Sequence, residues 1–410
     1  MTPNSPRRRT ERRGLLLWPV GTALTLTFTA AIAVAAAVFT AGWDLLGAQG
    51  LKPEHRLTSQ TLFDLVKLSF GVVAGAGALV ALVVAYRRQR VDEDGALRET
   101  TRLHTERFTT AVSQLGDASA AVRLGGVHAL AGLADDAPTR GLRQTCIDVL
   151  CAYLRLPYTA ETELPPDDAD ARHTYRALRE VRHTIIRLIR DHLRLPPDDP
   201  HSWQGHDLDF TGVVFDGGNF DDAVFSGGSV SFADTVFSQG TFGFAGAVFS
   251  GGSVSFTRTR FTGAEVYFVQ AEFLGGTVNF YKAEFSGGIV AFTHGQFVSG
   301  AFVFNDVTFT GSEVDFGAAT ISGGAVSFDR AVFSCGSVSF DHTAFMGGAV
   351  SFNHAVFSGS SVSFDHTAFV GAEGDFSNAR GIAPPGLVPS DGQGLPAGLR
   401  LPQAWLSPAP

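Results

Sequence analysis

Apolar residues return at a fixed period of 12 in the second half of the chain, between residues 208 and 376. One column of this repeat is phenylalanine throughout, at Phe232, Phe244, Phe256, Phe268, Phe280, Phe292, Phe304, Phe316, Phe328, Phe340, Phe352, Phe364 and Phe376. A second column begins at Phe225 and continues through Phe237, Phe249, Phe261, Phe273, Phe285, Phe297, Phe309, Ile321, Phe333, Phe345, Phe357 and Phe369. Self-similarity at a fixed period predicts a stack of like structural units.

Each unit is itself divided, because the spacing between phenylalanines alternates between five and seven residues. A small or β-branched residue precedes most of them by two positions, as Val230 precedes Phe232 and Thr235 precedes Phe237. Residues two apart lie on one face of an extended segment. We therefore predict short strands that place both columns in a shared apolar core, with Gly-Gly pairs at the corners.

The repeat allows two coil lengths. In a 24-residue coil, made of two repeats, Phe328 lies on Phe352 and His342 on His366, whereas in a 12-residue coil Phe340 joins the same column. About 13 repeats then give six to seven coils and a rod of about 30 Å, or twice that length for the shorter coil, at about 4.8 Å per coil. Two phenylalanines and a valine fill a 12-residue turn too tightly, so the sequence favours the longer coil.

The pattern of a small residue two positions before a central Phe resembles the pentapeptide-repeat family. The resemblance implies a right-handed, four-sided parallel β-helix with four units per coil. This chain departs from the family by inserting two residues, usually Gly-Gly or Ser-Gly, at every second unit. Together with the segments QTCIDVLCAYLRLPY and REVRHTIIRLIRDHL, the chain resembles actinobacterial membrane-associated pentapeptide-repeat proteins, a resemblance that implies no established activity.

Two uncharged apolar runs, at residues 14–43 and 68–86, lie near the N-terminus and are each long enough to span a bilayer. Arginines precede the first run and follow the second, which predicts that both ends stay in the cytoplasm with a short external loop at 44–67. A cleaved signal peptide is the alternative, but the first run is too long for its apolar region. The lipid bilayer is thus one predicted partner, and the predicted location is the cell membrane with most of the chain in the cytoplasm.

The predicted organisation has six parts. They are a basic cytoplasmic tail (1–13), a two-helix transmembrane hairpin (14–90), a helical cytoplasmic domain (91–195), a linker (196–207), the repeat β-helix (208–380) and a disordered Pro- and Gly-rich tail (381–410). The helical part shows amphipathic spacing, and Asp117 or Ser119 is a candidate helix cap.

Composition and motifs limit the kinds of site that the chain can contain. Three cysteines without a C-x-x-C motif indicate a reducing compartment and no disulfide framework. Residues 208–380 hold 11 Asp and 5 Glu against 5 basic residues, a net charge of −11, so no basic nucleic-acid footprint is present there. No phosphate-binding loop, nucleophile elbow or zinc-protease motif occurs. We therefore expect no enzyme activity, no cofactor, no catalytic residue and no metal site.

One histidine series is a candidate metal ladder. His294, His342, His354 and His366 share one repeat position, and imidazole suits zinc or nickel. Other members of that position, including Asp234, Arg258 and Gln270, are typical of a solvated corner, which is the interpretation we adopt.

The sequence therefore predicts a membrane-anchored, non-catalytic β-helical scaffold that presents a regular surface to a protein partner. A mimic of duplex DNA that binds a topoisomerase is the alternative implied by the family resemblance, and a β-helix enzyme is a further alternative. No nucleic acid is expected as a partner, and the sequence leaves the oligomeric state and the identity of the protein partner open.

Overall fold

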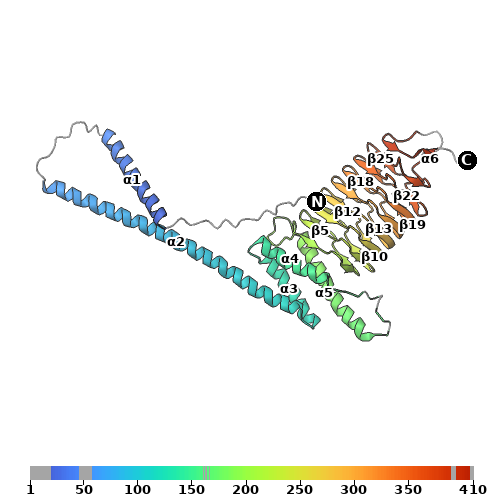
Figure 1. The fold of residues 1–410 in the computed structure, drawn as a ribbon, viewed down its shortest axis with the longest axis horizontal. Coiled ribbons are helices and arrows are strands. Elements are labelled where there is room, and N and C mark those ends of the chain that lie inside the picture. Colours follow the sequence, from blue (N-terminus) through green and yellow to red (C-terminus); the bar gives the residue numbers. More distant parts are fainter. Residues whose placement is uncertain are drawn as a thin grey trace, which may run out of the picture. The chain divides into compact units, whose positions relative to one another are not determined.

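The computed structural model describes residues 20–45, 58–159, 161, 164–165, 167–388 and 394–406 (Figure 1). The chain forms two compact units, residues 1–102 and 103–410. The predicted basic tail lies outside the described residues, as does half of the predicted external loop, residues 46–57. The helices are α1 (Val20–Leu45), α2 (Ser59–Leu115), α3 (Ala120–Asp135), α4 (Arg140–Leu154), α5 (Ala169–Arg194) and α6 (Gln403–Leu406).

Helix α2 runs through two regions that were predicted as separate, the transmembrane hairpin and the helical domain. It runs for 57 residues, through the second apolar run and into the predicted helical cytoplasmic domain, without a break near residue 90. The polar stretch between them contains no proline, and Arg90 pairs with Glu93 at 3.8 Å one turn on. Along the apolar part, large side chains such as Leu68, Phe70 and Val73 are exposed.

Among the described residues, α2 is the one helix long and apolar enough to cross a membrane. Helix α1 contains a shorter apolar stretch, Phe28–Ala41. The two-span hairpin therefore stays a prediction at this point.

Helices α3, α4 and α5 pack on one another and on the C-terminal end of α2. Thr139 caps α4 by accepting a hydrogen bond from Leu142 N, and Asp168 caps α5 in the same way. A Cβ at Gly126 in α3 would lie 2.5 Å from Leu115 N, so only glycine permits this close approach of α3 to α2.

The segment predicted as a linker, 196–207, packs against α5. Trp203 is fully buried, and its ring stacks on His192 of α5 at a centroid distance of 4.1 Å. The side-chain amide of Gln204 donates to the carbonyls of Leu193 and Leu195 at the end of α5. These contacts connect α5 to the first strand through a fixed turn.

The rest of the chain is a parallel β-solenoid of about eight turns, built from three sheets. The first sheet contains β1 (Leu208–Asp209), β5 (Ser229–Ser231), β9 (Ser253–Ser255), β12 (Thr277–Asn279), β15 (Ala301–Val303), β18 (Ala325–Ser327), β21 (Ala349–Ser351), β25 (Glu373–Asp375) and β27 (Leu399–Arg400). The second contains β2 (Val214–Phe215), β3 (Gly218–Asn219), β6 (Val236–Phe237), β7 (Thr241–Gly243), β10 (Arg260–Tyr267), β13 (Glu284–Ala291), β16 (Thr308–Asp315), β19 (Val332–Ser339), β22 (Val356–Phe357), β23 (Ser361–Ser363) and β26 (Arg380–Gly381). The third contains β4 (Val224–Phe225), β8 (Val248–Phe249), β11 (Glu272–Phe273), β14 (Gln296–Phe297), β17 (Thr320–Ile321), β20 (Ala344–Phe345) and β24 (Ala368–Phe369).

The strand register confirms the 24-residue coil. Val326 pairs with Val350 and Phe309 with Phe333, in each case two repeats further along the chain. The first coil is shorter, because Leu208 pairs with Val230. Two residues are missing there between Phe215 and Phe220, where the spacing is five instead of seven.

The predicted apolar columns fill the interior. All of their members among the described residues are buried except Phe369, which is partly buried. Phe328 stacks on Phe352 at 4.7 Å with the rings 5° from parallel, and Phe340 meets both edge-on, at 5.6 and 5.7 Å. Two ring columns thus interlock at half-coil intervals, which favours both offset stacking and edge-to-face contact.

Part of the predicted disordered tail, 381–410, is ordered in the described residues. Residues 394–406 return to the solenoid, where β27 pairs with β25 and Trp405 Nε1 donates to Gly381 O at 2.8 Å. The Trp405 ring lies against Phe357 and Phe376. Residues of low overall hydrophobicity order here because they cover the exposed end of the phenylalanine columns.

The interior assignment leads to a first test. Phe328→Asp places a carboxylate among stacked rings, and we expect a loss of roughly 4 kcal/mol or more in unfolding free energy. Ser327→Asp is the matched control, because Asp315 and Asp375 at equivalent positions accept the same backbone N–H, two residues on, that Ser327 accepts. Its expected cost is below about 1 kcal/mol. Thermal unfolding of the full-length chain in detergent measures both, and equal losses would contradict the inward assignment.

Candidate functional site

The histidine position forms one corner of every half-coil. Its non-glycine members all have φ between 55° and 59°, and they are Asp222, Asp234, Arg258, Gln270, Lys282, His294, Asp306, Ala318, Arg330, His342, His354 and His366. This left-handed conformation costs a non-glycine residue about 1 kcal/mol. It aims the backbone N–H of most members at the next coil, as His342 N donates to Asp365 O at 2.9 Å.

Side chains at these corners stack in the order that a 24-residue coil requires. His342 lies on His366 with ring centroids 4.9 Å apart, whereas His354 belongs to the other corner column. In that column Arg258 and Arg330 each form two hydrogen bonds to the aspartate one coil below. Within the described part of the chain, no group of three or more His, Cys, Asp or Glu is arranged to hold a metal ion. The position acts as a solvated turn.

One outer face of the solenoid carries an apolar stripe, which we define as Leu274, Val298, Met346 and Val370. These residues are one or two coils apart, so they stack on successive or alternate coils, with Ser322 between them. They are 40–60% exposed. The residues that follow them, Gly275, Ser299, Gly347 and Gly371, are all small. Sequence reasoning used the inward columns and overlooked this outward one, although the same period carries it.

The solenoid is joined to the helices through Asp216, in the shortened first coil. Tyr158 and Tyr175 donate to its carboxylate at 2.5 and 2.6 Å. Arg179 and His183, one and two turns along α5 from Tyr175, add contacts at 3.1 and 3.2 Å. The missing two residues bring Asp216 under α5, and its buried carboxylate is fully engaged.

Burial alone would raise the pKa of Asp216, but the hydrogen bonds from His183, Tyr158 and Tyr175 outweigh it and hold that pKa well below its ordinary value. Burial and the bond to Asp216 raise the pKa of Tyr175 to about 12, so its phenol remains a donor at neutral pH. Removing one partner from a buried, hydrogen-bonded charge of this kind typically costs about 3–5 kcal/mol. The network therefore has a structural role, which is to attach the solenoid to α5.

A second group of contacts, around His192, connects α5 to Asp135 and Trp203. Its Nδ1 lies 2.6 Å from Leu188 O and its Nε2 lies 3.1 Å from Asp135, which also accepts a hydrogen bond from Trp203 Nε1. Both ring nitrogens face acceptors, which favours the imidazolium. Burial lowers the pKa of His192, but the bonds to Asp135 and Leu188 outweigh this and the pKa is raised.

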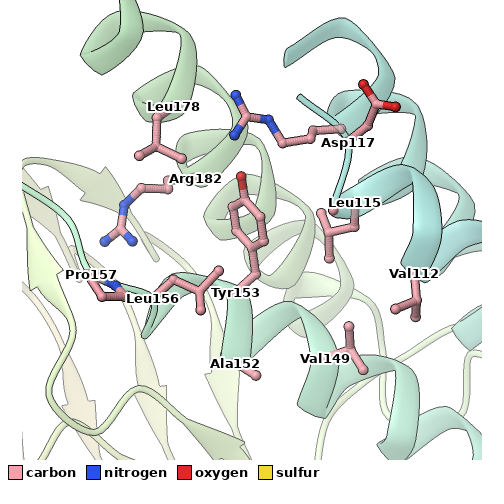
Figure 2. Close-up of a pocket in the computed structure, with 12 residues that line it drawn as sticks. Val112, Leu115, Asp117, Val149, Ala152, Tyr153, Leu156, Pro157, Leu178 and Arg182 are labelled. Atoms are coloured by element: carbon pink, nitrogen blue, oxygen red, sulfur yellow. The ribbon is translucent and has the colours of Figure 1, made fainter. Parts of the chain in front are cut away.

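A cavity of about 470 Å³ lies between the end of α2 and helices α3, α4 and α5. Figure 2 shows Tyr153 of α4 projecting into it between Leu115 on one side and Leu178 and Arg182 on the other. Tyr153 is only 8% exposed, yet its hydroxyl proton has no acceptor in the described structure. An unpaired buried polar group costs about 1–3 kcal/mol.

Arg123 Nε, in the lining of the same cavity, is also buried without a hydrogen-bond partner in the part of the chain that the structure describes. Burial raises the pKa of Tyr153, which the charge of Arg123, the contact of the Arg123 guanidinium with the phenol oxygen and the charge of Arg182 oppose. The phenol therefore keeps its proton near neutral pH. No sequence signal pointed to this cavity, since its lining comes from four separate helices and its polar groups are far apart along the chain.

Comparison of the chain with protein-family models, with curated proteins and with known structures finds no match for its sequence or its fold.

The raised pKa of His192 predicts a pH dependence of stability. A raised folded pKa contributes stability that is fully present below the unfolded value of about 6.5 and is lost as pH rises through the folded value. His192→Gln should therefore lower the melting temperature most near pH 6 and progressively less above that. Melting curves of both chains between pH 6 and 9 measure the difference, and His128→Gln, exposed on α3, is the control. A difference that grows with pH would contradict the imidazolium.

Proposed function

We propose that this chain is a membrane-anchored, non-catalytic scaffold whose pentapeptide-repeat-like solenoid, expected to be right-handed, presents a regular surface to a protein partner. The apolar stripe carries the proposal. Four large apolar side chains in register, each followed by a glycine or a serine, expose apolar surface to water, and such surfaces typically mark interaction sites. The stripe repeats at the coil spacing, so a partner with an apolar ridge can contact several coils at once.

The carboxylates of the solenoid support a non-catalytic role. Asp209, Asp315 and Asp375 each accept a hydrogen bond from the backbone N–H two residues on. Asp234 and Asp306 are each paired with an arginine. These groups are used to shape turns and corners, and the pairing also neutralises part of the acidic surface that a mimic of duplex DNA would need.

Membrane anchoring rests on the apolar part of α2. Its large side chains are exposed along the helix, and no protein surface within the described unit covers them. A bilayer would remove that surface from water. Helix α1 would supply a second span, and the arginines at residues 87, 88 and 90 would keep the following domain in the cytoplasm.

The proposed topology is tested by reporter fusions after Pro410 and within the loop near Lys52. Two spans with both ends in the cytoplasm place these two sites on opposite sides of the membrane. A reporter after Pro410 that is active only outside the cytoplasm would overturn the topology.

The stripe is tested by a charge substitution with a matched control. Met346→Asp with Val370→Asp places two charges on the stripe, whereas His342→Asp with His366→Asp places two charges on the same coils at a corner column that already contains Asp222. Captured from native membranes, the stripe variant should lose a bound partner by about tenfold or more. The corner variant should retain it. Equal loss in both, or no loss in either, would contradict the stripe as the docking surface.

A further inference from the structure

The cavity between α2, α3, α4 and α5 holds two buried hydrogen-bond donors that lack acceptors. Tyr153 Oη and Arg123 Nε both line it, the Arg123 guanidinium lies beside the phenol, and neither donor finds an acceptor within the described structure. Folded proteins pair nearly all such groups, with protein, water or a ligand. Since both groups can donate, the species that satisfies them together carries acceptor oxygens.

The charge of the lining selects a negative ligand. Arg182 is buried, and its guanidinium donates to the carbonyls of Leu154 and Val214. Asp117 is the one carboxylate in the lining, and its Oδ1 accepts a hydrogen bond from Ser119 N at 2.7 Å. Two arginines against one aspartate leave the cavity positive.

The remaining walls are apolar. Val112 and Leu115 at the end of α2 face Val149 and Leu178 on α4 and α5, and Leu156 closes one side (Figure 2). A volume of about 470 Å³ lies in the range of small-molecule sites. A small inorganic anion would leave these walls uncovered, and a neutral hydrocarbon would leave both donors unpaired.

We propose that this cavity binds an anionic amphiphile, a carboxylate or phosphate group with an aliphatic chain. The anionic group accepts hydrogen bonds from Tyr153 and Arg123, and the chain lies along the leucine and valine walls. A free acyl acid and an anionic membrane lipid share this chemistry. The cavity shares no residue with the apolar stripe, so this proposal can be tested separately from the scaffold function.

The test uses the full-length chain in nanodiscs of phosphatidylcholine, with empty nanodiscs as the blank. Laurate, dodecanol and acetate are the probes, because they separate the charge from the chain. Laurate should bind with excess signal over the blank, and dodecanol and acetate at least about tenfold more weakly. Nanodiscs that also contain phosphatidylglycerol distinguish the two sources. Laurate displaced by that lipid identifies a membrane lipid as the occupant, and laurate retained identifies a free acyl acid.

Two variants link the binding to the cavity. Tyr153→Phe and Arg123→Gln should each weaken laurate binding by about tenfold. Tyr153→Phe removes an unpaired hydroxyl, so without ligand its melting temperature should not fall, which separates lost binding from lost folding. Arg187→Gln, exposed on α5 and outside the cavity, is the control and should bind laurate as the unaltered chain does.

Three results would overturn the proposal. They are laurate binding no stronger than to empty nanodiscs, dodecanol binding as tightly as laurate, and unchanged laurate affinity in both Tyr153→Phe and Arg123→Gln. A failure of the stripe variants to lose a protein partner would leave these results unaffected, so the two proposals are decided separately.

Discussion

The solenoid depends on a match between two distances, the spacing of hydrogen-bonded coils and the centroid separation that offset-stacked aromatic rings prefer. Parallel strands in neighbouring coils lie about 4.8 Å apart. Rings one coil apart lie at nearly the same separation, 4.7 Å for Phe304 on Phe328 and 4.7 Å for Phe328 on Phe352. The backbone ladder therefore holds the rings in contact without stretching either set of interactions. The half-coil offset adds edge-to-face contacts between columns, so each ring is enclosed on all sides.

Such a stack must end, and its two ends are covered in different ways. At the N-terminal end the helical domain is joined to the first coil through Asp216, whose position follows from the coil being two residues short. At the C-terminal end residues 394–406 add a last strand, and Trp405 lies on the final phenylalanines. The covered ends make the solenoid finite and leave its sides as the accessible surface.

Most of the solenoid could be predicted from the sequence, because its order is one-dimensional. The period, the two inward columns and the 24-residue register follow from the positions of phenylalanine and from the volume that two rings need. The contacts around Asp216 and Trp203 could not be predicted in this way. Asp216 is recognisable as special only once the missing two residues are seen to bring α5 over it, and the burial of Trp203 depends on contacts with α5. The order of the C-terminal segment likewise depends on the end of the stack and not on its own composition.

The candidate sites also divide into one that the repeat predicts and one that depends on tertiary packing. The period identifies the corner histidines and also explains them, since every non-glycine member of that position has a left-handed backbone and the side chain is free to vary from Asp to Arg to His. The cavity around Tyr153 has no period, and its groups come together only through the packing of α3 on the end of α2, which Gly126 permits. The repeat requires apolar residues at its inward positions, so the residues that determine what the protein binds must lie at other positions. They lie at the outward positions that the repeat leaves free, and in the irregular domain that the repeat does not govern.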